Sequence, residues 1–341
     1  MDLVIERVQR VISESVEEAH RDPCKMRALA RKAVKMAAGL PVSSRAANDL
    51  RAEAWANLAN AFRVCNDFAD AGPAFEWAWH FHAAGAGGAT ITARLCELQG
   101  SLYESLRRPA EALACLNRAL EHREELGDLE GIGRCLVQQA NVIGHAGDPV
   151  EAVRLLMRAM SFVSASKNPR LAYALAHNLC WFLVDAGHPE TAMTLLLERR
   201  LREAEEGCPL LANGDETMEA RSRWLEARIA AGLGDFEAAA HEMEEVRQFF
   251  EARGLPYEVA LLSVELALLQ RPADAIQTVC GLRGIFRDLG LGRESVAVQL
   301  VETALAAGEI TEVLPYVLRA LRTSPPATGR RKVASRRPVH A

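Results

Sequence analysis

The sequence lacks the features that mark membrane and exported proteins. No window approaches eighteen uninterrupted apolar residues, the length that a membrane-spanning helix needs. The apolar run at the N-terminus contains charged residues from Asp2 to Arg7, which argues against a signal peptide. With 50% hydrophobic and 25% charged residues, the 341-residue chain has the composition of an ordinary globular protein. We therefore expect a cytoplasmic protein that does not contact a membrane.

Paired cysteines are also missing. None of the eight cysteines belongs to a C-x-x-C pair, and most of them lie on apolar helical stripes, where a free cysteine packs as a small hydrophobic residue. His80 and His82 are two residues apart and lie on different faces of a helix. His177 and Cys180 have the spacing to share a ligand, but Cys180 stands at a packing position. We expect neither a disulfide framework nor a metal site.

Catalytic motifs are absent as well. The chain contains no H-E-x-x-H, G-x-S-x-G or dinucleotide-binding pattern. The glycine-rich residues 85–88 lack the lysine and hydroxyl of a phosphate-binding loop, and we interpret them as a flexible joint. We therefore expect a protein that is not an enzyme and has no cofactor.

The basic charge is confined to one end of the chain. Residues 330–341 hold five cations and no acid, so residues 1–329, with 35 Lys and Arg against 45 Asp and Glu, carry a net charge of −10. An acidic body with a short basic tail is not the usual footprint of direct nucleic-acid binding. We expect a protein or peptide partner, while the oligomeric state stays open.

The most informative stretch runs from Trp55 to Ala78. Two apolar stripes at helical spacing are separated by a polar breaker at residues 66–67, which predicts a pair of antiparallel helices. Small residues fall where the two helices cross closely, and large ones fill the space beside the crossing. These residues are Trp55, Leu58, Ala59 and Phe62 in the first helix and Ala71, Phe75 and Ala78 in the second.

The same arrangement returns at intervals of 36 to 47 residues. The small residue of each second helix marks the register, at Ala71, Ala112, Ala152, Ala192, Ala239, Ala275 and Val313. Turn residues such as Gly147-Asp148-Pro149 precede most of these positions. A further hairpin is predicted before them, from a helix over residues 2–20 and another over residues 24–38.

This pattern resembles the tetratricopeptide repeat, in which a W-x2-L-G-x2-Y helix precedes a helix with A-x3-F. The repeat after Trp55 keeps Gly100, Tyr103, Ala112, Leu116 and Ala119 in the corresponding places. The period of about forty exceeds the usual 34 and resembles the long repeats of bacterial regulators with a helical sensor domain. The resemblance implies an all-α fold, a right-handed superhelical solenoid of antiparallel helix hairpins.

The predicted organisation has three parts. Residues 1–48 form an N-terminal capping hairpin, and residues 49–322 form the solenoid, with a possible hinge near residues 207–214. Residues 323–341 form a disordered basic tail, because they have almost no apolar surface to offset the entropy of ordering.

In the tetratricopeptide family the first helices of the hairpins line a concave groove that holds a peptide. The resemblance therefore implies a peptide-binding surface, and Asn60 and Asn141 occupy the position from which an amide contacts a peptide backbone. The lysine of the family's carboxylate-gripping clamp is missing, since Ala56, Glu97 and Val137 stand in its place. The predicted peptide-binding residues are Asn57, Asn60, Arg63, Arg94, Arg134, Gln138, Asn141, His177, Asn178, Trp181, Arg221 and Arg228.

Two functions remain open at this point. The first is a protein-interaction scaffold that binds an extended peptide or a partner protein in its groove. The alternative is a peptide- or ligand-sensing regulatory module that acts with a separate DNA-binding partner, because the hairpins leave no room for a DNA-binding domain in this chain. Neither the partner nor the pathway follows from the residues, because a fold does not specify a function.

Overall fold

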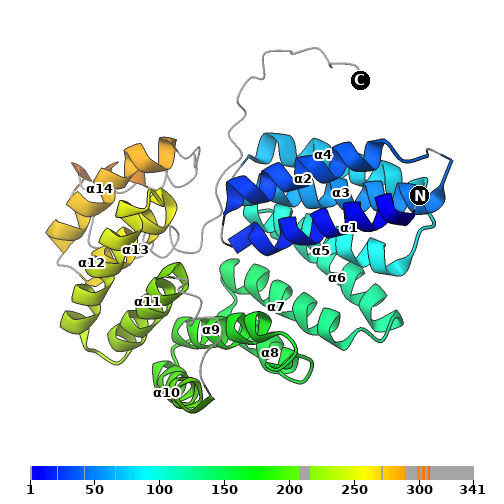
Figure 1. The fold of residues 1–341 in the computed structure, drawn as a ribbon. Helices are drawn as coiled ribbons and strands as arrows, with labels where there is room; N and C mark the ends of the chain where they lie inside the picture. Colours follow the sequence, from blue (N-terminus) through cyan, green and yellow to red (C-terminus); the bar gives the residue numbers. More distant parts are fainter. Residues whose placement is uncertain are drawn as a thin grey trace. The chain divides into compact units, whose positions relative to one another are not determined.

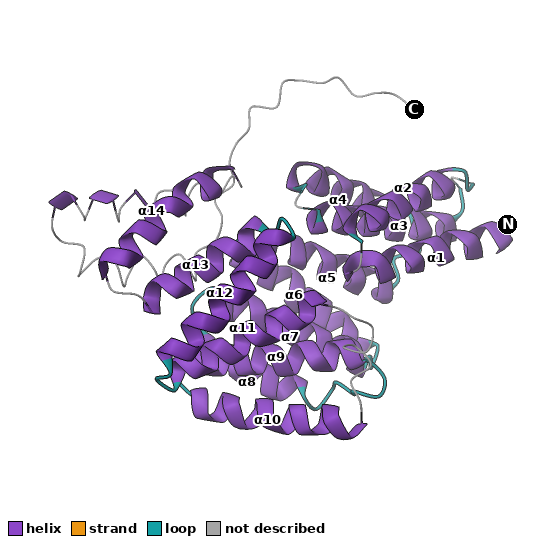
Figure 2. Cartoon of the chain, turned by 60° about the vertical axis from the view of Figure 1, so that its left-hand side comes forward, coloured by secondary structure: helices purple, strands orange, loops and turns teal. Residues whose placement is uncertain are grey.

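The structure, a computed structural model, is helical throughout the part that it describes. It describes residues 2–20, 22–41, 43–65, 67–206, 216–269 and 272–288, with the short stretches 298–299, 302–303 and 306–307. Figure 2 shows helices and loops, and no strand, among these residues. The expected all-α fold of sequential helix hairpins is confirmed. No helix in the described ranges has both the length and the apolar character needed to cross a bilayer.

The chain divides into two compact units, Met1–Ala186 and Gly187–Ala341. In the first unit, consecutive helices pack against one another as hairpins (Figure 1). Its helices are α1 Asp2–Glu17, with a 3-10 turn at Glu18–His20, α2 Pro23–Ala38, α3 Arg45–Val64, α4 Phe68–Ala83, α5 Ala89–Ser105, α6 Pro109–Glu125, α7 Leu129–His145, α8 Pro149–Ala159 and α9 Pro169–Asp185.

The second unit continues the pattern of hairpins. The pairs α11 with α12 and α13 with α14 are in contact, as are α12 and α13. The helices described in this unit are α10 Pro189–Glu206, α11 Glu216–Gly232, α12 Phe236–Ala252, α13 Pro256–Leu269 and α14 Pro272–Asp288.

The helix boundaries follow from local turn chemistry. In the turn between α7 and α8, Gly147 has φ +106°, a conformation that favours glycine. Asp148 then accepts a hydrogen bond from the Glu151 amide, and Pro149 occupies the first position of α8, where its missing N–H is not needed. The sequence turn Gly147-Asp148-Pro149 therefore ends one helix and starts the next, as predicted.

The core of each hairpin consists of the small and large residues that define the repeat. Ala59, Ala71 and Ala78 are fully buried where α3 and α4 cross, and Phe75 beside them is 1% exposed. Trp55 is only half-buried and stacks on Trp77, with ring centroids 6.0 Å apart. Fully buried register alanines recur at the same phase in later hairpins, at Ala112, Ala152, Ala192 and Ala239. The predicted register is thus confirmed over these positions.

The N-terminal hairpin is continuous with the repeats that follow it. Met26 and Ala30 of α2 belong to the same buried cluster as residues of α3, α4 and α5. The predicted division at residue 48 stays a prediction. The predicted hinge near 207–214, the register residue Val313 and the tail 323–341 lie outside the described residues, and the Ala275 side chain is not described.

The glycine-rich linker between α4 and α5 is anchored to α3. The Ala86 amide donates to the Asp49 carboxylate at 3.1 Å, and Asn48 Nδ2 donates to the Ala84 carbonyl at 3.0 Å. A Cβ on Gly85 would clash with the Asp49 carboxylate, so a larger residue would displace the side chain that holds the linker. The linker is therefore fastened by side chains, where the sequence led us to expect a flexible joint.

Candidate functional site

The first helices of neighbouring hairpins in the first unit are joined by polar side chains. Arg63 Nη1 of α3 donates to Ser105 Oγ of α5 at 3.3 Å. Gln138 of α7 donates through Nε2 to Ser101 Oγ of α5 at 3.1 Å. We call the set formed by Asn60, Arg63, Ser101, Ser105, Gln138, Asn141 and Asn178 the polar ladder.

The polar ladder continues to α9 through a pair of amides. Asn178 Nδ2 donates to Asn141 Oδ1 at 2.8 Å. At its other end, Asn60 Oδ1 accepts from Arg63 Nε at 2.9 Å. All four side chains are half-buried, so each keeps contact with solvent. The structure thus brings together five of the predicted residues, Asn60, Arg63, Gln138, Asn141 and Asn178, on one run of first helices.

Two predicted residues are not on an exposed surface. Asn57 is 3% exposed and donates through Nδ2 to Ser15 Oγ of α1 at 2.9 Å. Arg228 is also 3% exposed, and its Nε lies 3.1 Å from Glu265 Oε1 of α13. Both residues point toward a neighbouring helix that covers them. We therefore remove Asn57 and Arg228 from the candidate surface.

The remaining predicted residues on α9 form an aromatic column. His177 stacks on Tyr173, with ring centroids 6.2 Å apart and an interplanar angle of 16°. Trp181 lies on the other side of His177, with centroids 5.9 Å apart. In the second unit, Arg221 is exposed and its Nη2 lies 3.2 Å from Glu258 Oε1.

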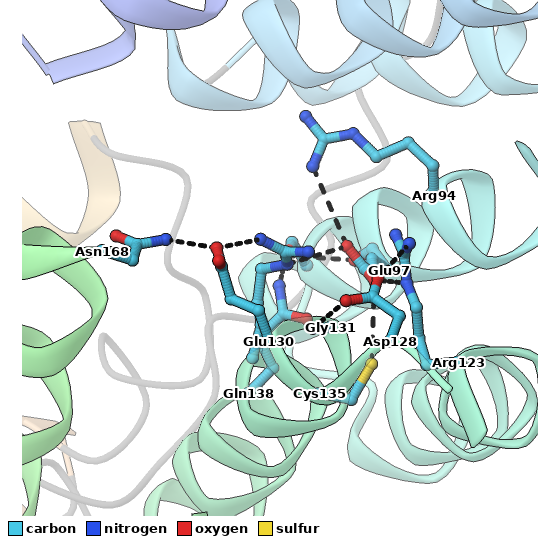
Figure 3. A network of polar contacts seen from close by, with 11 residues as sticks. Arg94, Glu97, Arg123, Asp128, Glu130, Gly131, Cys135, Gln138 and Asn168 are labelled. Atoms are coloured by element: carbon cyan, nitrogen blue, oxygen red, sulfur yellow. Dashed lines mark hydrogen bonds and ion pairs between the residues drawn. The ribbon is translucent and has the colours of Figure 1, made fainter. Parts of the chain in front are cut away.

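A buried carboxylate beside the ladder collects three arginines (Figure 3). Glu97 of α5 is 1% exposed. Arg123 Nε donates to Glu97 Oε1 at 2.7 Å. Arg134 Nε lies 3.3 Å from Glu97 Oε2, and Arg94 Nη1 lies 3.8 Å from the same oxygen. We call these four residues the Glu97 cluster.

Further contacts fix the Glu97 cluster in place. Arg123 Nη1 donates to Asp128 Oδ2 at 2.8 Å, and Asp128 Oδ1 accepts from the Gly131 amide at 2.9 Å, which caps α7. Glu130 Oε1 accepts from Asn168 Nδ2 at 2.7 Å and lies 3.8 Å from Arg134 Nη1. Figure 3 shows these contacts, which join residues of α5, α6 and α7 to Asn168 at the start of α9.

The electrostatic balance differs among Arg123, Arg94 and Arg63. Burial on its own lowers the pKa of Arg123, but the charge and hydrogen bond of Glu97 and the charge of Asp128 outweigh it and raise that pKa. Burial lowers the pKa of Arg94, and Glu97 offsets it only in part. Burial likewise lowers the pKa of Arg63 more than Glu104 raises it. The partner carboxylates therefore dominate the pKa shift of Arg123, whereas burial dominates those of Arg94 and Arg63.

The structural role of Arg123 does not follow from the inward phase of the first helices, on which Arg94, Glu97 and Arg134 lie. Arg123 comes from a second helix, α6, where it is 6% exposed. A signal was present in the sequence. Arg123 follows Leu116 and Ala119 at helical spacing, so a charged residue occupies a core position and requires a buried partner.

The repeat assignment has independent support. Residues 93–125, which cover the hairpin of α5 and α6, match the family model described as tetratricopeptide repeat. The chain therefore contains a tetratricopeptide repeat in this hairpin. The match covers the repeat that carries Arg94 and Glu97, so this part of the candidate surface lies on a tetratricopeptide hairpin. A comparison with curated protein sequences gives no match.

Two solved structures resemble this chain along nearly its whole length. One is a Rap protein complexed with Competence and Sporulation Factor, with 13% identity, a TM-score of 0.59, and coverage of 93% of this chain and 97% of that one. The other is aspartyl phosphate phosphatase F from Bacillus subtilis, with 13% identity, a TM-score of 0.54, and coverage of 93% of both chains. At this identity the likeness establishes a shared fold.

Proposed function

We propose that this protein is a peptide-sensing regulatory module, which binds an extended peptide along the polar ladder and thereby changes its affinity for a partner protein. One observation carries the proposal. The chain shares its fold, over 93% of its length, with a Rap protein solved in complex with Competence and Sporulation Factor. This favours a sensing module over a static scaffold, which was the first interpretation of the sequence.

The polar ladder has the chemistry to hold a peptide backbone. An amide side chain both donates and accepts hydrogen bonds, as a peptide group does. Asn60 and Asn141 use their Oδ1 atoms within the ladder, and in the described ranges their Nδ2 groups donate to no other residue. These two amide nitrogens are therefore available to backbone carbonyls of a ligand that runs across α3, α5 and α7.

The ladder also couples ligand binding to the spacing of the hairpins. Its hydrogen bonds join α3 to α5, α5 to α7, and α7 to α9. A peptide that forms hydrogen bonds with Arg63, Gln138 or Asn178 replaces the hydrogen bonds that these residues make to neighbouring helices. Such a ligand binds differently to two arrangements of the hairpins, which is the condition for shifting a conformational equilibrium. We infer that the module acts without catalysis or cofactor, in the cytoplasm, on a separate DNA-binding regulator.

The proposal is tested with the full chain and a library of randomised short linear peptides. The chain should capture a defined subset of these peptides, and the captured sequences are then synthesised. Next, partner proteins are captured from a native extract with and without a saturating amount of the synthetic peptide. A sensing module predicts that the peptide changes the amount of partner captured. Failure to capture any peptide would contradict the function, and an unchanged amount of partner would favour a static scaffold.

A further inference from the structure

The polar ladder borders two arginines that share one carboxylate oxygen. We propose that Arg94 and Arg134 form a binding site for a carboxylate group of the peptide ligand. This inference rests on the peptide-binding function proposed above and names the chemistry of the ligand. It is distinct from the missing lysine clamp, because it uses two arginines from neighbouring first helices.

Glu97 holds the two guanidinium groups close to each other. Arg94 comes from α5 and Arg134 from α7, and both lie within 4.0 Å of Glu97 Oε2, at 3.8 and 3.3 Å. The other oxygen, Oε1, accepts from Arg123 at 2.7 Å. Oε2 of Glu97 thus faces both Arg94 and Arg134, while Oε1 is hydrogen-bonded to Arg123.

The donors of the two arginines are largely unused. In the described ranges, neither Arg94 nor Arg134 donates a hydrogen bond to a side chain or carbonyl, since their contacts with Glu97 and Glu130 are ion pairs only. The Nε of Arg134 is buried and has no hydrogen-bond partner, so a ligand would approach the terminal Nη groups of this side chain. The Arg94 and Arg134 side chains are 35% and 30% exposed, so both remain accessible from solvent. A guanidinium presents five N–H donors in a fork that matches a carboxylate.

The acidic neighbours leave room for a further anion. Asp128 is bound to Arg123 and to the Gly131 amide, and Glu130 accepts from Asn168 and lies 3.8 Å from Arg134 Nη1. Burial raises the pKa of the Glu53 carboxyl group on α3, and the charge of Arg94 lowers it in part. Burial lowers the pKa of Arg94, and the charge of Glu97 opposes this only in part. A ligand carboxylate supplies both the missing charge and the missing acceptors.

A peptide can supply the carboxylate from an acidic side chain or from its C-terminus. Three pools of randomised short peptides distinguish these two sources. The first pool has a free C-terminus and no Asp or Glu, the second has an amidated C-terminus with Asp and Glu, and the third is amidated with Asn and Gln in their place. The unmodified full chain is used for affinity selection from each pool. The first and second pools carry carboxylates and are the acidic pools, and the third is the neutral pool. We expect peptides from one acidic pool to bind at least about ten-fold tighter than peptides from the neutral pool, as hydrogen bonds to a charged group predict.

Substitutions locate the effect. Arg94→Gln with Arg134→Gln should remove the preference for the acidic pool, and Arg94→Lys with Arg134→Lys should retain only part of it, because lysine keeps the charge but lacks the fork. The matched control, Arg154→Gln with Arg158→Gln on α8, removes the same charge from arginine side chains that are 66% and 49% exposed and should keep the full preference.

The outcomes separate this inference from the function on which it rests. Equal capture from the neutral and acidic pools by the unmodified protein would overturn the carboxylate site and leave peptide binding intact. A preference for acidic peptides that survives in the glutamine variant would overturn the assignment to these arginines. Capture from none of the pools would overturn peptide binding and the carboxylate site together.

Discussion

Arg123 Nε donates to Glu97 Oε1 across 2.7 Å, and the two side chains are 7% and 1% exposed. This pair joins the second helix α6 to the first helix α5 of the same hairpin. Through Asp128 and Arg134 it also reaches α7 of the next hairpin. The Glu97 cluster is therefore a polar core for two successive repeats, and it supports the surface on which we place the ligand.

Removing the central carboxylate should destabilise the protein. Glu97→Ala leaves the buried Arg123 with Asp128 alone, and it also leaves Arg94 and Arg134 without their nearest anion. Breaking a buried ion pair costs about 3 to 5 kcal/mol, which urea denaturation measures directly. Glu121→Ala, an exposed change on α6, should stay within about 0.5 kcal/mol of the parent. Similar losses from the two variants would mean that the Glu97 cluster contributes little to folding.

Overpacking at a helix crossing should also be costly. Ala152 is fully buried at the crossing of α7 and α8, so Ala152→Leu should lower the free energy of unfolding by about 1 to 3 kcal/mol. Ala114 is exposed on α6, and Ala114→Leu should be milder. Equal effects in chemical denaturation would show that the repeat register is wrong.

Two glycines should respond to alanine in opposite directions. A Cβ at Gly144 of α7 would clash with the ring of Phe182 on α9, a residue that is only 2% exposed. Gly144→Ala should therefore destabilise by about 1 to 3 kcal/mol. Gly281 lies on an exposed face of α14 with open space around it, so Gly281→Ala should stabilise by about 0.5 to 1 kcal/mol. Thermal unfolding compares the two variants with the parent.

The buried cysteines should resist alkylation. Burial, with a smaller contribution from the charge of Glu97, raises the pKa of Cys96 to about 11 and that of Cys135 to about 12. Since the thiolate is the nucleophile, a raised pKa reduces the reactive fraction at every pH below that value. At pH 8 the exposed Cys24 should react with iodoacetamide well before Cys96 and Cys135 do. Peptide mapping by mass spectrometry gives the order, and rapid labelling of Cys135 in the folded protein would contradict its burial.

The fold was largely predictable because the residues that pack the helices recur at a regular interval along the sequence. The register alanines, the turn at Gly147 and the hairpin from Trp55 to Ala78 all lie where the sequence places them. These features depend on helical spacing within a single hairpin, which a sequence displays directly.

The candidate site was less predictable because it depends on which element covers each helix face. The spacing of α3 gives Asn57 the inward phase, yet α1 buries it, and α13 does the same to Arg228. The role of Arg123 depends on a partner 26 residues away on another helix. Contacts between repeats, rather than spacing within one repeat, therefore decide which polar residues are available to a ligand.

Peptide binding by the double variant Asn60→Ala with Asn141→Ala shows whether the polar ladder is the binding surface. We expect this variant to bind a library-selected peptide about ten-fold more weakly or worse than the parent, because each lost backbone hydrogen bond contributes about 0.5 to 1.5 kcal/mol. Its melting temperature should be close to that of the parent, and Gln248→Ala, an exposed amide on α12, should bind normally. If the double variant binds the peptide as tightly as the parent does, the polar ladder is not the binding surface.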